Sequence, residues 1–111
     1  MLRATLTTIT TIALISLLLP TLSADSHGGD AEKGGALFET KCSVCHFSDS
    51  NEKKIGPGLS GIKEGKLPSG KDATEENIAK NLNEGGGGMP AFENLLTGEE
   101  KKHIIAFLKT L

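Results

Sequence analysis

Apolar residues fall at helical spacing in three separate stretches of the chain. The stretch nearest the C-terminus has four apolar residues at the spacing of one helix face: Ile104, Phe107, Leu108 and Leu111. Ahead of them, Thr97 and Glu100 form the T-x-x-E pattern of a capping box, which marks the start of a helix. Residues 47–71 are instead rich in Gly, Ser, Lys and Pro, and no stretch alternates with the period of a β-strand. The pattern therefore predicts an all-α fold with long loops.

The first of these stretches predicts a helix over about residues 31–41, with Asp30 as its N-cap. Its apolar face carries Gly34, Leu37 and Phe38, spaced as on one side of a helix. Two glycines in the middle of a helix cost roughly 1 kcal/mol each relative to Ala, so they need an explanation. Close approach by another helix would supply one.

A second helix is predicted over about residues 74–83, between the first and the last. It presents Ile78 and Leu82 on one face, at a spacing of four residues. Either Asp72 or Thr74 is a suitable N-cap for it, because both side chains accept hydrogen bonds from free backbone N–H groups.

The N-terminal part of the chain has the outline of a secretory signal peptide. Arg3 precedes an apolar run at residues 9–19, and small residues follow up to Ala24. We therefore expect residues 1–24 to be a signal peptide and residues 25–111 to be the mature domain of an exported protein. The expected location is a periplasm or a compartment like the thylakoid lumen. An uncleaved membrane anchor is the alternative, although the run is shorter than the roughly 20 residues that a bilayer span needs.

The charge of the mature domain argues against a nucleic-acid partner. Of the 12 basic residues only Arg3 precedes residue 25, so residues 25–111 carry eleven Lys against 14 Asp and Glu, a net charge of −3. The lysines are mixed with acidic residues and form no basic stripe. A domain of this size with no Trp, no Tyr and only four Phe buries little apolar surface, and we expect a covalent or metal staple.

The two cysteines and a histidine lie together in the segment CSVCH, which contains Cys42, Cys45 and His46. C-x-x-C-H is the attachment signature of a c-type haem. Two thiols separated by two residues can each form a thioether with a vinyl group of one porphyrin, and the histidine that follows then lies beneath the iron. Three alternatives remain: a redox dithiol, a disulfide, and a zinc site completed by His27 and His103.

Met89 is the only methionine left once the expected signal peptide is removed, and it follows four consecutive glycines, residues 85–88. A lone methionine is often core filler, but this one lies in a glycine-rich loop and is followed by Pro90. A soft thioether on a loop that allows close backbone approach is suited to be a second axial ligand of iron. We therefore predict that Met89 is that ligand.

On these residues the chain resembles the class I monohaem cytochromes c, particularly the small bacterial and photosynthetic members. The resemblance covers nearly the whole mature chain, from GDAEKGGALFETKCSVCH through IGPGLSGI and GGMPAF to IIAFLKTL. It implies a fold of three to four helices, with long loops wrapped around one covalently attached haem c. Gly34 and Phe38 match the family's contact residues on the first helix, and Ile104 and Phe107 match their partners on the last.

The same resemblance implies a role for each residue of the site. Cys42 and Cys45 carry the thioethers, His46 is the proximal ligand of the iron and Met89 the distal ligand. Pro57, in the segment GPG, matches the position whose backbone carbonyl accepts a hydrogen bond from the proximal histidine. Such a partner fixes the orientation of the imidazole ring.

An iron ligated by His and Met has no open position for a substrate, so we expect an electron carrier rather than an enzyme. The expected partners are redox proteins. The chain itself is expected to be a monomer without a stable membrane anchor. The alternative is a haem protein with a labile distal site that acts as a weak peroxidase or ligand sensor. The glycine run 85–88 is the support for that alternative, because it allows a loose distal loop.

Two further features are given ordinary interpretations. His103 lies at the edge of the apolar stripe of the last helix and is expected to be a solvated surface residue. Five lysines follow the C-x-x-C-H motif and form either a ring around the exposed haem edge or a mixed, solvated surface: Lys53, Lys54, Lys63, Lys66 and Lys71.

Overall fold

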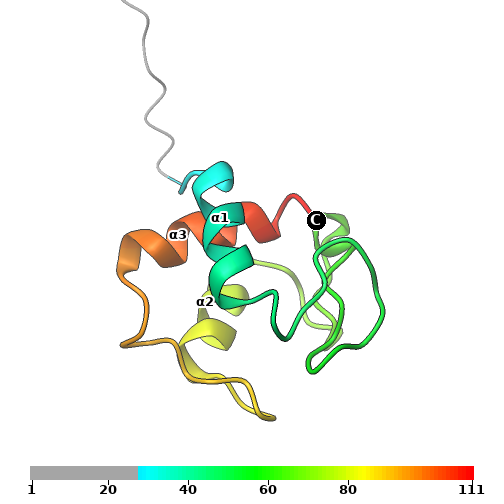
Figure 1. Cartoon of the computed structure of the whole chain (residues 1–111). Coiled ribbons are helices and arrows are strands. Elements are labelled where there is room, and N and C mark those ends of the chain that lie inside the picture. The colour runs from blue at the N-terminus through cyan, green and yellow to red at the C-terminus, as the bar shows by residue number, and fades with distance from the viewer. Residues whose placement is uncertain (1–27) are drawn as a thin grey trace, which may run out of the picture.

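The computed structural model describes residues 28–111 (Figure 1), and the predicted signal peptide lies outside the described residues. Four helical elements occur in this order: α1 at Ala31–Lys41, the short 3-10 helix η1 at Ile62–Glu64, α2 at Glu75–Glu84 and α3 at Gly98–Leu108. Within residues 28–111, β-structure is limited to two isolated bridges. The all-α fold class and the three α-helices predicted from the sequence are confirmed.

Each α-helix begins at a side-chain cap. The Asp30 carboxylate accepts hydrogen bonds from the first turn of α1, and Thr97 and Glu100 form the predicted capping box of α3. Of the two caps considered for α2, Thr74 is the one used: its hydroxyl accepts a hydrogen bond from the backbone N–H of Asn77. These contacts fix where each helix starts, because they satisfy N–H groups that have no partner within the helix.

Helix α1 packs against α3, so that the first and last helices of the described chain cross (Figure 1). Gly34 lies at the closest approach, where a Cβ atom would overlap the backbone carbonyl of His103. One turn further on, the Phe38 and Phe107 rings pack with their centroids 5.3 Å apart. Ile104 of α3 is fully buried beside them. The glycine in mid-helix thus has the explanation that the sequence suggested.

The expectation that His103 is a solvated surface residue is wrong. Its ring is half-buried, and its Nδ1 atom accepts a hydrogen bond from the backbone N–H of Asp30 at 2.8 Å. Asp30 is the N-cap of α1, so the imidazole of α3 holds the start of α1 in place. The sequence could not show this contact, because 73 positions separate the two residues.

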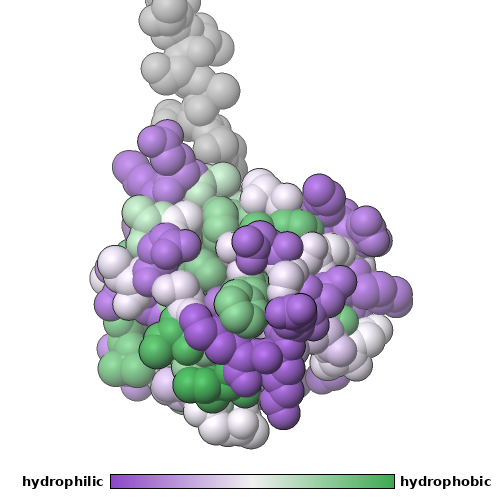
Figure 2. All heavy atoms as spheres, turned by 45° about the vertical axis from the view of Figure 1, so that its right-hand side comes forward, coloured by the Kyte–Doolittle hydropathy of each residue, from purple (hydrophilic) through white to green (hydrophobic). Residues whose placement is uncertain are grey.

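The remaining elements close the fold around one apolar core. Its buried members come from all four helical elements and from the loops: Phe38, Ile62, Leu67, Ile78, Leu82, Leu96, Ile104, Ile105 and Leu108. The end of the chain returns to η1, where the N–H groups of Gly61 and Lys63 donate to the Leu111 carbonyl (Figure 1). On the face drawn in Figure 2, hydrophilic residues cover most of the right side, and hydrophobic residues are exposed at the lower left. No helix within residues 28–111 is both long enough and apolar enough to span a bilayer.

Candidate functional site

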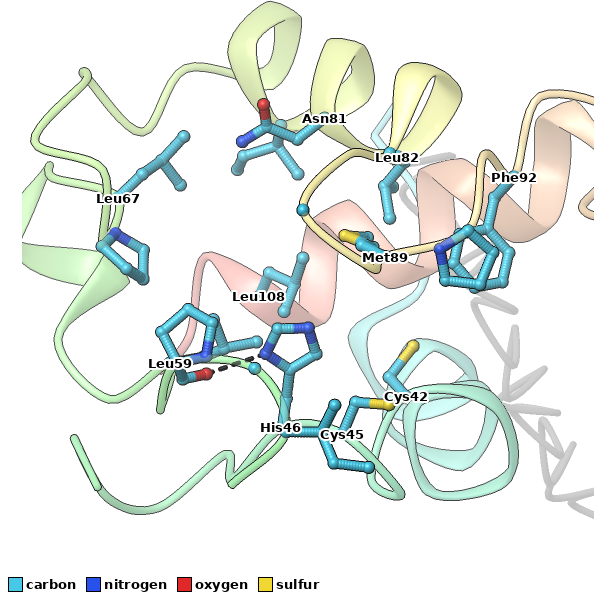
Figure 3. A pocket seen from close by; sticks show the side chains of 18 of the residues that line it. Cys42, Cys45, His46, Leu59, Leu67, Asn81, Leu82, Met89, Phe92 and Leu108 are labelled. Atoms are coloured by element: carbon cyan, nitrogen blue, oxygen red, sulfur yellow. Dashed lines mark hydrogen bonds between the residues drawn. The ribbon is translucent and has the colours of Figure 1, made fainter. Parts of the chain in front are cut away.

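A cavity of about 520 Å³ lies within the fold, and the residues predicted from the sequence meet there (Figure 3). Cys42, Cys45, His46, Pro57 and Met89 all line it. In the view of Figure 3, the two cysteines and His46 come from the lower wall, and Met89 comes from a loop above them. The walls are mostly apolar and are formed by the ends of α1 and α3, one face of α2 and the loop that precedes η1.

The two cysteines lie on a tight turn at the end of α1. Cys42 is the C-cap of this helix, and its N–H donates to the carbonyl oxygen of Phe38. The N–H groups of Cys45 and His46 then both donate to the Cys42 carbonyl oxygen at 3.0 Å, which turns the chain back toward the cavity. Both cysteines are half-buried and their sulfur atoms are not joined to each other.

The structure gives no support to the alternatives for this motif. A redox dithiol needs a thiol with a low pKa, but burial raises the pKa of the Cys42 thiol, and the neighbouring Cys45 raises it further. The motif also follows the C-terminus of a helix, whose partial negative charge does not favour a thiolate. Within residues 28–111, no three His, Cys, Asp or Glu side chains come together as a zinc site would need. His27, which the zinc alternative would use, lies outside the described residues.

The imidazole of His46 has a defined orientation and protonation. Its Nδ1 atom lies 2.8 Å from the carbonyl oxygen of Pro57. A carbonyl oxygen can only accept a hydrogen bond, so Nδ1 carries the proton and donates it. In the neutral ring the Nε2 atom is therefore left with a free lone pair, which is the form that binds a metal.

Gly56 is a site residue that sequence reasoning missed. A Cβ atom at this position would lie 2.5 Å from Cε1 of His46, so only glycine leaves room for the imidazole ring. Its N–H also donates to the carbonyl oxygen of Cys45 at 2.7 Å, which ties this segment to the attachment turn. The only signal in the sequence was the position of Gly56 directly before Pro57 in the GPG segment.

Met89 follows a turn made of glycines in a conformation that other residues rarely adopt. Gly86 and Met89 exchange two backbone hydrogen bonds of 3.0 and 3.1 Å across the turn. Residues 85–88 all have positive φ angles, between 61° and 116°. The turn allows the Met89 side chain to enter the cavity, where it packs against the apolar core. The four consecutive glycines are thus explained by the backbone that brings Met89 to this position.

A few polar side chains interrupt the apolar lining. Asn81 of α2 lies on the upper wall in Figure 3, and Ser69, Lys41 and Lys53 complete the set. Asn81 was not identified from the sequence, because it lies beside Leu82 at the flank of the helix's apolar stripe. Of the α2 residues that line the cavity, Asn81 is the one with a polar side chain, which can interact with a bound group.

The residues that line the cavity fit a covalently bound haem c. Two thiols lie together on one turn, an imidazole nitrogen with a free lone pair enters from the same wall, and a thioether sulfur comes from a distant loop. The apolar walls are suited to a flat macrocycle.

Comparison with known proteins also indicates a protein that binds haem c covalently. The family described as "Cytochrome C oxidase, cbb3-type, subunit III" matches residues 29–108. The chain is 31% identical over 80 residues to cytochrome c6 of Leptolyngbya boryana, covering 71% of this chain and 89% of that protein. It is 31% identical over 100 residues to cytochrome c of Euglena viridis, covering 75% and 98%. Among solved structures, cytochrome c6 from the diatom Phaeodactylum tricornutum is similar, with a TM-score of 0.59, 27% identity, and coverage of 74% of this chain and 93% of that one.

These findings define a small c-type cytochrome, the class of protein that carries electrons. The chain belongs to the class I monohaem cytochromes c. Membership of this family implies a covalently bound haem c. The class I cytochrome c fold that the sequence resemblance implied is confirmed.

Proposed function

We propose that this chain is an exported electron carrier that shuttles single electrons between partner proteins. In this proposal Cys42 and Cys45 hold the haem through thioethers, His46 is the proximal ligand and Met89 the distal one. The observation that carries the proposal is the hydrogen bond from His46 Nδ1 to Pro57, which leaves Nε2 free at a cavity that Met89 also lines.

The protein's own residues then account for a carrier rather than an enzyme. Bound haem c supplies a one-electron couple. Ligation by both His46 and Met89 leaves no coordination position for a substrate and favours a relatively high reduction potential. The mostly apolar walls exclude water from the site, and the packing of α1 on α3 limits rearrangement when the charge changes.

Exposed apolar side chains beside the cysteines mark the surface where partners would dock. Val44 and Ile55 line the mouth of the cavity and are 65% and 69% exposed. Lys41 and Lys53 line the same mouth. We expect a redox partner with an acidic rim, bound weakly and steered by charge, as suits a carrier that must also dissociate.

The proposed location is a periplasm or a compartment like the thylakoid lumen, and the support is the signal-like composition of residues 1–24. The mature domain would then be residues 25–111, and it would act as a monomer without a stable membrane anchor.

A second candidate function is a weak peroxidase or ligand sensor with a labile distal site. It is favoured by the turn before Met89, whose glycines 86–88 have open space where a Cβ would be. A turn without side-chain packing restrains Met89 weakly. In this case an exogenous ligand would displace the thioether readily.

The test is to produce the full chain in a host that attaches haem, then measure its mass and its absorbance in both oxidation states. The proposal predicts one covalent haem and a low-spin, six-coordinate spectrum with the iron–thioether charge-transfer band. Met89→Ala should keep the haem and lose the band, whereas Leu95→Ala, at an exposed residue of the following loop, should leave the band unchanged. Absence of a haem adduct would refute the proposal, and five-coordinate high-spin iron in the unaltered protein would favour the second candidate.

A further inference from the structure

Lys54 contacts both sides of the turn that carries the cysteines. Its Nζ atom donates a hydrogen bond to the Ser43 carbonyl oxygen at 2.7 Å. The same ammonium lies 5.0 Å from the centroid of the Phe47 ring. Ser43 lies between Cys42 and Cys45, and Phe47 directly follows His46. One positive charge thus bridges the beginning and the end of the attachment turn.

The backbone around Lys54 binds the same turn at two further points. The N–H of Gly56 donates to the Cys45 carbonyl at 2.7 Å, and the Pro57 carbonyl accepts a hydrogen bond from His46 Nδ1 at 2.8 Å. The Lys54 N–H donates to the Gly56 carbonyl at 2.9 Å, which folds this segment on itself. Residues 54–57 therefore contact four of the five residues from 43 to 47.

We propose that Lys54 is a positioning residue for the proximal ligand. Its ammonium holds Ser43 and Phe47 in place, so that residues 54–57 stay against the turn and the Pro57 carbonyl keeps His46 in one orientation. The inference rests on the proposed role of His46 as a ligand. It also separates Lys54 from the other loop lysines, which the sequence could assign only to a ring around the haem edge or to a mixed surface.

The two contacts of Lys54 suit this role because both depend on its charge. A hydrogen bond from an ammonium is shorter and stronger than one between neutral groups. An ammonium over the face of an aromatic ring gains a further cation–π attraction. Arginine can make both contacts through its planar guanidinium, whereas methionine has a similar length and can make neither.

The experiment compares Lys54→Met with Lys63→Met in the haem-containing protein. Each variant removes one positive charge, but Lys63 is exposed on η1 and does not line the cavity. Hydrogen exchange of the Gly56 amide and of the His46 Nδ1 proton is measured by NMR. We expect Lys54→Met to accelerate both about three- to tenfold, as the loss of one charged hydrogen bond implies, and Lys63→Met to leave both within about twofold.

A spectroscopic readout separates positioning from a general loss of stability. The paramagnetic shifts of the haem methyl groups in the oxidised protein depend on the orientation of the proximal imidazole ring. Lys54→Met should change the pattern of these shifts, Lys54→Arg should restore it, and Lys63→Met should leave it unchanged. Phe47→Leu, which removes only the ring contact, should give an intermediate change and serves if Lys54→Met does not fold.

Equal effects of Lys63→Met and Lys54→Met would overturn the inference, because charge alone would then explain them. Failure of arginine to restore the pattern would overturn it as well. The proposed function fails separately, at an earlier step: an unaltered protein without haem, or one whose spectrum shows no histidine ligand, would be seen before any variant is compared.

Discussion

The Nδ1 atom of His46 lies 2.8 Å from the carbonyl oxygen of Pro57, and this contact decides which ring nitrogen faces the cavity. The two residues are 11 positions apart, and the chain between them must return closely enough for a glycine to lie under the ring. The orientation of the His46 ring thus depends on the backbone of the loop as much as on the C-x-x-C-H motif.

Gly56→Ala should displace the His46 ring, because the added methyl group would lie 2.5 Å from Cε1 and the ring cannot move without losing Pro57. We expect a lower yield of haem-containing protein and a free energy of unfolding reduced by about 2 kcal/mol or more. Chemical denaturation with haem quantification measures both. Gly98→Ala, at the open first position of α3, is the control and should be neutral or slightly stabilising. An unchanged yield and stability for Gly56→Ala would show that the His46 ring can move to accommodate the added methyl group.

Gly87→Ala should destabilise the protein although nothing lies within 4 Å of the new Cβ, because its φ angle is +61°. Left-handed backbone costs a non-glycine residue roughly 1 kcal/mol. Gly87→Asn should cost less, since asparagine adopts this conformation more readily. In thermal denaturation, the melting temperature should therefore be lowest for Gly87→Ala, higher for Gly87→Asn and highest for the unaltered protein. The reverse order would mean that the turn relaxes to another conformation.

His103→Leu should weaken the seating of α1 on α3, because it removes the acceptor of the Asp30 N–H. Loss of that hydrogen bond at a half-buried position should lower the free energy of unfolding by about 1 kcal/mol. His103→Asn is the matched variant, since its side-chain oxygen can take the place of Nδ1, and most of the stability should be retained. If both variants lose the same amount, the packing of the ring rather than its nitrogen is what matters.

The ion pair between Lys66 and Asp72 makes the stability of the fold depend on pH, in a direction that the structure defines. The hydrogen bond from the Lys66 ammonium lowers the pKa of Asp72 below its ordinary value of 3.8, and its positive charge adds to the effect. A carboxyl with a depressed pKa contributes stability that is present above the unfolded value and is lost as pH falls through the folded one. NMR titration should place Asp72 below 3.8, and Lys66→Met should return it toward that value. A pKa unaffected by Lys66→Met would contradict the pairing.

The helices and the main site residues could be predicted from the sequence because their signals are local. Asp30 and Thr97 cap the helices that immediately follow them, and the Cys and His residues of the motif lie within five consecutive positions. That Met89 lines the same cavity was also expected, from its glycine-rich surroundings. The roles of these residues toward a haem remain predictions for the experiments above.

The contacts that escaped prediction join segments that are distant in sequence or use backbone atoms. His103 binds an N–H group 73 positions away, and the role of Gly56 depends on the place of a ring from another segment. Lys54 could not be told from the neighbouring lysines, because a charge in a loop has no periodicity to show where it points. Short 3-10 helices such as η1 lack a repeating pattern as well, and this one was not predicted.

The crossing of α1 and α3 has a consequence for how the molecule is made. Because Gly34 and Phe38 need the last helix as their partner, every cavity-lining segment lies within one long closed loop of chain. Closing such a loop costs entropy before its contacts can compensate. While α3 is still inside the ribosome, the chain therefore has its thiols in place but lacks the helix that closes the cavity. The pocket becomes available only after α3 has emerged.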